Sequence, residues 1–69
     1  MSRAVNIDAN QADVTAMAAK HNAAISAIEP LLPRGTRVVF MNMAGAEAVS
    51  RAYGDRVLTG AVTRRPVRL

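Results

Sequence analysis

The sequence predicts a small α+β domain in which a long N-terminal helix packs on a small sheet of two or three strands with a short second helix. Three observations predict this class. The chain has 69 residues, enough for a single domain. Apolar residues recur at spacings of three and four over residues 11–29, and a short run rich in valine lies at 37–41. We therefore expect residues 1–69 to form one α/β domain, with residues 65–69 as a loose basic tail.

The first elements are a strand and a helix. Residues 3–7 predict a short strand, and Asp8 and Asn10 are residue types that commonly precede a helix. The helix is expected from about Gln11 to Glu29, and it is interrupted at Pro30. Its predicted length is close to the diameter of a globule of this size, so two or three short strands cover only part of it.

This helix is predicted to have two contrasting faces. The apolar face consists of Val14, Met17, Ala18, His21, Ala24, Ile25 and Ile28. His21 is therefore expected to be a core or interface imidazole. The opposite face is a stripe of small residues that would let a second helix approach closely: Ala12, Ala16, Ala19, Ala23 and Ala27. Alanine is also the best helix former and tolerates solvent, so this stripe has a second, purely local explanation.

The second half of the chain predicts a strand, a helix and a further strand. Residues 37–41 are apolar on both faces, which indicates a central strand covered on both sides. Asn42 is expected to cap a helix over about Gly45–Tyr53, and Gly54 is expected to end it. The residues of this helix predicted to point inward are Ala46, Val49 and Tyr53.

A last strand is expected at residues 56–64. The 14 residues between the two strands suffice for a right-handed parallel crossover, which gives a β-α-β unit. The alternative is an antiparallel arrangement, a helix plus hairpin, in which 56–59 and 61–64 fold about Gly60. Pro66 disfavours continuation as a central strand.

Composition limits the classes of protein. Apolar residues make up 51% of the chain, but 14 of them are alanines, so the core is modest. There is no cysteine, no stretch of about 20 apolar residues and no secretory signal, so we expect a cytoplasmic protein that is not in a membrane. The net charge of +4 belongs entirely to residues 35–69, and no acidic residue follows Asp55.

The motifs of common catalytic sites are missing from the sequence. With one histidine and no cysteine, a zinc site is not expected. None of the three serines lies in a nucleophile elbow, and the four glycines match no phosphate-binding loop. We therefore expect no enzyme, no cofactor and no metal. An active site shared between subunits around His21 is kept as a third hypothesis.

The C-terminal segment is the one positive functional feature of the sequence. Arginine side chains suit phosphates, and threonine hydroxyls add neutral donors. The candidate residues for binding an anion or a partner are Arg56, Thr59, Thr63, Arg64, Arg65 and Arg68. The structural alternative is a solvated edge strand whose charges prevent aggregation.

Taken together, these features predict a small non-enzymatic binding protein, typical of bacterial or phage accessory proteins and inhibitors. It would form a homodimer through the alanine stripe and engage a macromolecular partner, a protein, through a sheet edge and the basic strand. The alternative function is binding of a nucleic acid or nucleotide through the C-terminal arginines.

Overall fold

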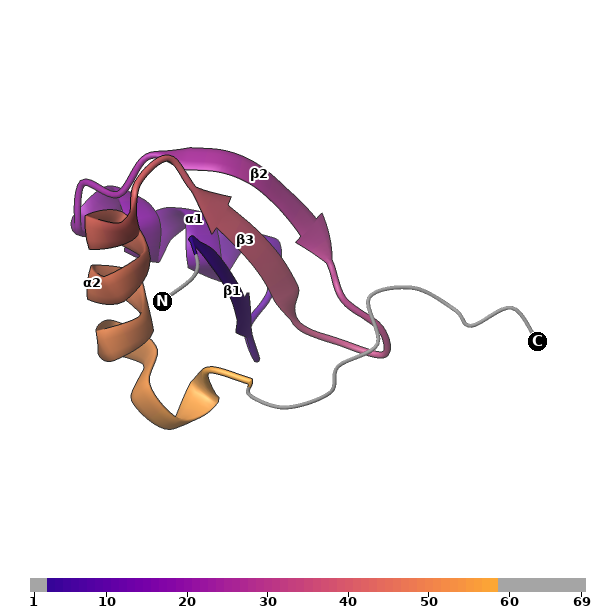
Figure 1. Cartoon of the computed structure of the whole chain (residues 1–69). Coiled ribbons are helices and arrows are strands. Elements are labelled where there is room, and N and C mark those ends of the chain that lie inside the picture. The colour runs from indigo at the N-terminus through magenta and orange to yellow at the C-terminus, as the bar shows by residue number, and fades with distance from the viewer. Residues whose placement is uncertain (1–2, 59–69) are drawn as a thin grey trace.

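The computed structural model describes residues 3–58, which form a three-stranded sheet with two α-helices (Figure 1). In chain order the elements are β1 (Ala4–Ile7), α1 (Gln11–Lys20), β2 (Ile25–Pro30), β3 (Thr36–Phe40), α2 (Met43–Tyr53) and a 3₁₀ turn (Gly54–Arg56). The predicted α+β class, the first strand and the second helix are confirmed. Neither of the two described α-helices is long and apolar enough to cross a membrane.

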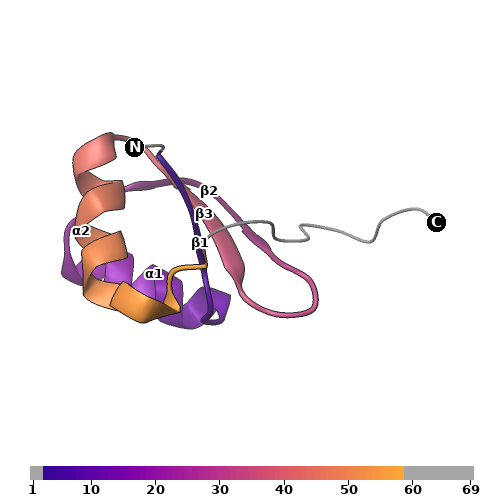
Figure 2. The same ribbon diagram turned by 60° about the horizontal axis from the view of Figure 1, so that its bottom comes forward.

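β3 is the central strand, as predicted for residues 37–41. It pairs antiparallel with β1 on one side and with β2 on the other. Both helices lie on the same face of the sheet (Figure 2), and the side chains of β3 that face them are all buried: Thr36, Val38 and Phe40. The expected cover on both faces is not provided by the described elements, because Arg37 and Val39 point to the opposite face and are half-buried.

The predicted parallel crossover is right in direction, but its two segments are not neighbours. β1 is antiparallel to both β3 and the bridge at Val57, so the chain after α2 runs parallel to β3 with β1 between them. Both edges of β3 are occupied by β1 and β2, so the chain that leaves α2 reaches β1 instead. There Val57 forms an antiparallel bridge with Ile7. The amide of Asp8 donates to the carbonyl oxygen of Arg56 at 2.8 Å, and the amide of Leu58 donates to that of Asn6 at 2.7 Å. The rest of the predicted strand 56–64, and the alternative hairpin about Gly60, lie outside the described residues.

The prediction of a long N-terminal helix is wrong, because α1 has 10 residues and ends at Lys20. The backbone of Asn22 is left-handed, with φ of 55°. The amide of Asn22 donates to the carbonyl of Ala19 at 3.1 Å, and that of Ala23 donates to the carbonyl of Ala18 at 2.8 Å. This pair of bonds is a Schellman motif, which satisfies the last carbonyls of a helix and turns the chain away from it.

A β-bulge explains why residues 25–28 look helical in the sequence. Ile25 pairs with Phe40 and Ile28 pairs with Val38, so both isoleucines point toward the helices. A register shift between Ile25 and Ala27 places one extra residue between them. The two isoleucines are therefore three residues apart, which is helical spacing, although they lie in a strand.

The core lies between the two helices and the inner face of the sheet. Its largest fully buried apolar side chains come from β1, β3 and the two helices: Ile7, Val14, Val38, Phe40 and Val49. Thr36 is the only polar side chain that is buried among the described residues. Its hydroxyl donates to the carbonyl of Ala9 at 2.7 Å, so burial leaves it satisfied.

α2 follows the prediction closely. The side-chain oxygen of Asn42 accepts from the amide of Gly45 at 2.9 Å, which caps the helix as expected. The buried residues of α2 are the three that were predicted: Ala46, Val49 and Tyr53. At its start, a Cβ built on Gly45 would lie 3.0 Å from the Cβ of Ala23, so α2 packs closely on the turn that follows α1.

Substitution of Gly35 tests the tight connection between β2 and β3. Gly35 has φ of +103°, and an added Cβ would lie 2.9 Å from the backbone oxygen of Ile7. Gly35→Ala is expected to lower the free energy of unfolding by about 2–3 kcal/mol, from backbone strain together with this close contact. Urea denaturation measures the change.

The matched control for this substitution is Gly54→Ala. Gly54 also has a positive φ, of +56°, but nothing lies within 4 Å of its added Cβ. Only the conformational cost applies there, about 1 kcal/mol. Equal losses for the two variants would contradict the close approach at Gly35.

Candidate functional site

The outer edge of β2 is a strand edge with which no described residue pairs. β2 is the last strand of the sheet order β1-β3-β2. The amide of Leu31 donates to the carbonyl of Gly35 at 2.9 Å. Hydrogen-bonded and non-hydrogen-bonded pairs alternate along an antiparallel ladder, so the backbone groups of Glu29 point toward Arg37 of β3. Ile28 and Pro30 therefore direct their backbone groups outward. Since proline has no N–H, Ile28 carries the outward donor of this part of the strand.

The opposite edge of the sheet is closed. The backbone bonds described above between residues 56–58 and residues 6–8 cover the outer side of β1. Proteins commonly protect strand edges in this way, because free backbone groups pair with other chains. Within residues 3–58 the two edges of the sheet therefore differ, and the outer edge of β2 is the one that these residues leave unpaired.

Two exposed methionines follow β3. Met41 is 56% exposed and Met43, the first residue of α2, is 49% exposed. The amide of Met41 donates to the carbonyl of Ala24 at 2.9 Å, which places its backbone beside the start of β2. Unbranched methionine side chains adapt to different partner surfaces.

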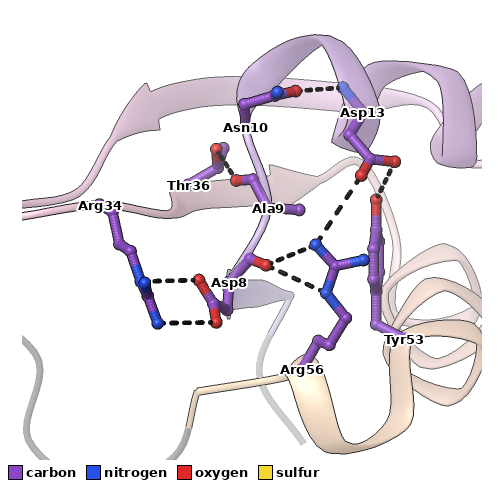
Figure 3. Close-up of polar contacts among 8 residues, drawn as sticks. All are labelled: Asp8, Ala9, Asn10, Asp13, Arg34, Thr36, Tyr53 and Arg56. Atoms are coloured by element: carbon purple, nitrogen blue, oxygen red, sulfur yellow. Dashed lines mark hydrogen bonds and ion pairs between the residues drawn. The ribbon is translucent and has the colours of Figure 1, made fainter.

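Arg56, the one predicted anion-binding residue that the structure describes, is engaged within the chain (Figure 3). Its Nη2 and Nε donate to the carbonyl oxygen of Asp8 at 2.8 and 3.1 Å. Nη2 also lies 3.9 Å from Oδ2 of Asp13, and the guanidinium lies 5.6 Å from the ring centroid of Tyr53. Arg56 thus ties the 3₁₀ turn to the loop between β1 and α1, which argues for a structural role.

A second arginine approaches the same loop from the β2–β3 connection. Nε and Nη2 of Arg34 lie 3.2 and 3.3 Å from the two carboxylate oxygens of Asp8, in a bidentate arrangement (Figure 3). An open groove of about 650 Å³ passes between these groups, lined by residues of the three connections that meet here. Because Asp8 already accepts from both arginines, the groove does not present them as a free cationic site.

The ion pairs show where uncompensated charge remains. Four of the five acidic residues in 3–58 lie within 4.0 Å of an arginine nitrogen, in the pairs Asp8–Arg34, Glu29–Arg37, Glu47–Arg51 and Asp13–Arg56. Residues 3–58 hold six basic and five acidic residues, whereas residues 59–69 hold three arginines and no acid. The excess positive charge therefore belongs to the C-terminal segment. The other candidate residues lie outside the described part: Thr59, Thr63, Arg64, Arg65 and Arg68.

His21 is not part of the core, so the first alternative of the prediction is wrong, and its place in an interface stays a prediction. It is the C-cap of α1 and is exposed. The apolar face that was extrapolated through His21 ends with the helix at Lys20, so nothing places the imidazole against the sheet. In addition, the described residues contain no group of three or more histidines, cysteines or carboxylates that could hold a metal ion.

The five alanines do not form one helix stripe. Ala12, Ala16 and Ala19 lie exposed on α1, on the side away from the core residues of that helix. Ala23 follows the helix and is buried, whereas Ala27 is exposed in β2. The stripe is broken because α1 ends early. Its role as a dimer interface, with Ala12, Ala16 and Ala19 on α1, stays a prediction.

The sequence does not predict this edge, because residues 25–29 have helical spacing and are expected in the first helix. Two local signals could have found it. Asn22 is a residue type that tolerates the left-handed conformation at a helix end, and Pro30 is acceptable in a strand only at an edge or a bulge.

Titration of Tyr53 tests the polar cluster in Figure 3. Burial raises the pKa of Tyr53 from 10.0 to about 12, helped by the hydrogen bond of its hydroxyl to Asp13 Oδ1, at 3.1 Å, and by the charge of Asp13, while Arg56 lowers it. The neutral phenol therefore stabilises the fold below pH 10. This contribution is lost as the pH rises from 10 through 12.

Asp13→Asn removes the charge and keeps an acceptor of similar shape. We expect the pKa of Tyr53 to fall, yet to stay above 10 because burial remains the largest cause. The chain has one tyrosine and no tryptophan, so the tyrosinate absorbance reports this group alone. Asp55→Asn, two residues from Tyr53 in the 3₁₀ turn, is the control and should leave the pKa unchanged. An unaltered pKa in Asp13→Asn would contradict the contact.

Comparison of the chain with protein-family models, with curated proteins and with solved structures finds no match. Function is therefore inferred from the β2 edge, the polar cluster and the distribution of charge.

Proposed function

We propose that this protein is a small non-enzymatic binding protein that takes a strand of another protein chain onto the outer edge of β2. The observation that carries the proposal is the asymmetry of the sheet. Residues 56–58 cover the edge of β1, whereas no described residue pairs with the edge of β2. Strand addition uses main-chain hydrogen bonds for affinity and neighbouring side-chain contacts for specificity.

The side chains near this edge support the proposal. Ile25 and Ile28 are only half-buried in the single chain, so an added strand would cover more of them. Met41, whose backbone lies beside the start of β2, adds exposed apolar surface. The core of the described residues is small, with 12 buried apolar residues of which four are alanine. Further burial of apolar surface against a partner would therefore stabilise the fold.

Ile28→Pro tests this proposal, because it removes the outward N–H and leaves the bonds of β2 to β3 intact. A protein captured from the source cells is titrated with the wild type and the variant. We expect saturable binding to the wild type and at least about tenfold weaker binding to the variant, from the lost hydrogen bond and the steric bulk of the ring.

Gln11→Pro is the matched control. Gln11 is the first residue of α1, where proline is well tolerated, and the preceding Asn10 is already extended. This variant should bind like the wild type. Equal binding by Ile28→Pro would refute the proposal. So would the lack of any saturable protein partner, where a second copy of this chain counts as a partner.

A second candidate function is binding of nucleic acid or nucleotide phosphates by Arg64, Arg65 and Arg68. It is favoured by the charge distribution, because the arginines of the described body have acidic or carbonyl acceptors, whereas the last 11 residues carry three arginines and no acid. Phosphate contacts of this kind need no pocket.

Salt dependence tests this second function. Three phosphate contacts predict that affinity for single-stranded DNA or RNA falls about 20-fold when salt rises from about 50 to 200 mM. The double variant Arg64→Glu/Arg65→Glu should abolish that binding. The control, Arg34→Glu/Arg51→Glu, changes the net charge equally in the body of the protein, where both side chains are 78% exposed. Equal losses in the two double variants would exclude a site at the C-terminal arginines.

A further inference from the structure

The edge of β2 has features that identify the chain which pairs with it. Going beyond the proposed function, and resting on it, we infer that this chain is a second copy of the protein. The two β2 strands pair antiparallel across a two-fold axis at Ile28, which joins two three-stranded sheets into one of six strands. Symmetric pairing of identical surfaces is the commonest form of protein assembly.

The backbone of Ile28 is self-complementary. Its N–H and C=O both point away from β3, so across a two-fold axis each Ile28 donates to and accepts from Ile28 of the second copy. Residue 27 then lies opposite residue 29 of the second copy. This segment, Ala27–Glu29, is on the regular side of the bulge, where the ladder with β3 is unbroken.

Neighbouring registers are less favourable. An axis at Glu29 would place two carboxylates directly opposite each other, and it would call on Pro30, which has no N–H to donate. An axis at Ala27 would need backbone hydrogen bonds from Ser26, which lies within the bulge. The axis at Ile28 avoids both problems.

Charge and size also fit the register at Ile28. Glu29 lies 3.8 Å from Arg37 on the outer face of its own sheet. In the dimer, each Glu29 faces the small, exposed Ala27 of the second copy. The two residues form a pair without backbone hydrogen bonds between them, the arrangement in which opposite side chains lie closest in an antiparallel sheet.

Position 27 therefore provides a test that is specific to this register. In Ala27→Lys a cation faces Glu29 of the second copy twice per dimer, and in Ala27→Glu a carboxylate does so. Ala27→Gln is the neutral control of similar size. We expect the dimer dissociation constants to rise in the order Lys, Gln, Glu, with about tenfold between the extremes at low salt. This difference should largely vanish in 1 M salt.

The experiment is sedimentation equilibrium of the full chain from 1 µM to 1 mM. The wild type and Gln11→Pro should be dimers within this range, and Ile28→Pro should be a monomer. Circular dichroism and the spread of amide proton chemical shifts in NMR spectra show whether each variant is folded. Because position 27 is exposed, its three variants test the register even if Ile28→Pro fails to fold.

Several results would overturn the inference. A wild type that stays monomeric at 1 mM overturns it, while binding of another protein that is sensitive to Ile28→Pro would leave the proposed function standing. A dimer that is indifferent to charge at position 27 overturns the register at Ile28. A dimer lost in Ala16→Arg, on the exposed side of α1, but kept in Ile28→Pro would place the interface on the helix and remove the support for the β2 edge.

Discussion

The loop between β1 and α1 is the point on which the other connections depend. Two of its carbonyl oxygens, those of Asp8 and Ala9, accept from Arg56 and from the buried hydroxyl of Thr36. The bond to Ala9 is buried, and an unsatisfied polar group there would cost about 1–3 kcal/mol. The Asp8 carboxylate in turn accepts from Arg34. One short loop thereby fixes the start of β3, the β2–β3 connection and the end of α2 (Figure 3).

This arrangement determines which edge of the sheet residues 3–58 cover. Arg56 holds the 3₁₀ turn against the loop, so residues 56–58 run along the outer side of β1 and close it. The helices cover one face of the sheet, and β2 is left at the other edge. The same contacts that stabilise the fold therefore engage Arg56 within the chain, while its side chain is 54% exposed.

The excess positive charge and the outer edge of β2 belong to different parts of the sequence. The arginines of residues 3–58 have acceptors within the chain, most of them carboxylates, while the excess positive charge is carried by the last 11 residues. A protein strand and a phosphate chain would be recognised by different parts of the sequence. For this reason the two candidate functions predict that binding is lost in different variants.

The sequence by itself determined the elements whose signals are local: the strand at 3–7, the cap at Asn42, the inward side of α2 and the strand at 37–41. It also placed the charge excess near the C-terminus. The tertiary structure decided where α1 ends and how the strands pair. The bulge in β2 places Ile25 and Ile28 at helical spacing, and only their pairing with β3 shows that they lie in a strand. The sequence does not predict that β2 is an edge strand within residues 3–58 for the same reason, because hydrogen bonds between distant strands depend on partners that the local sequence does not specify.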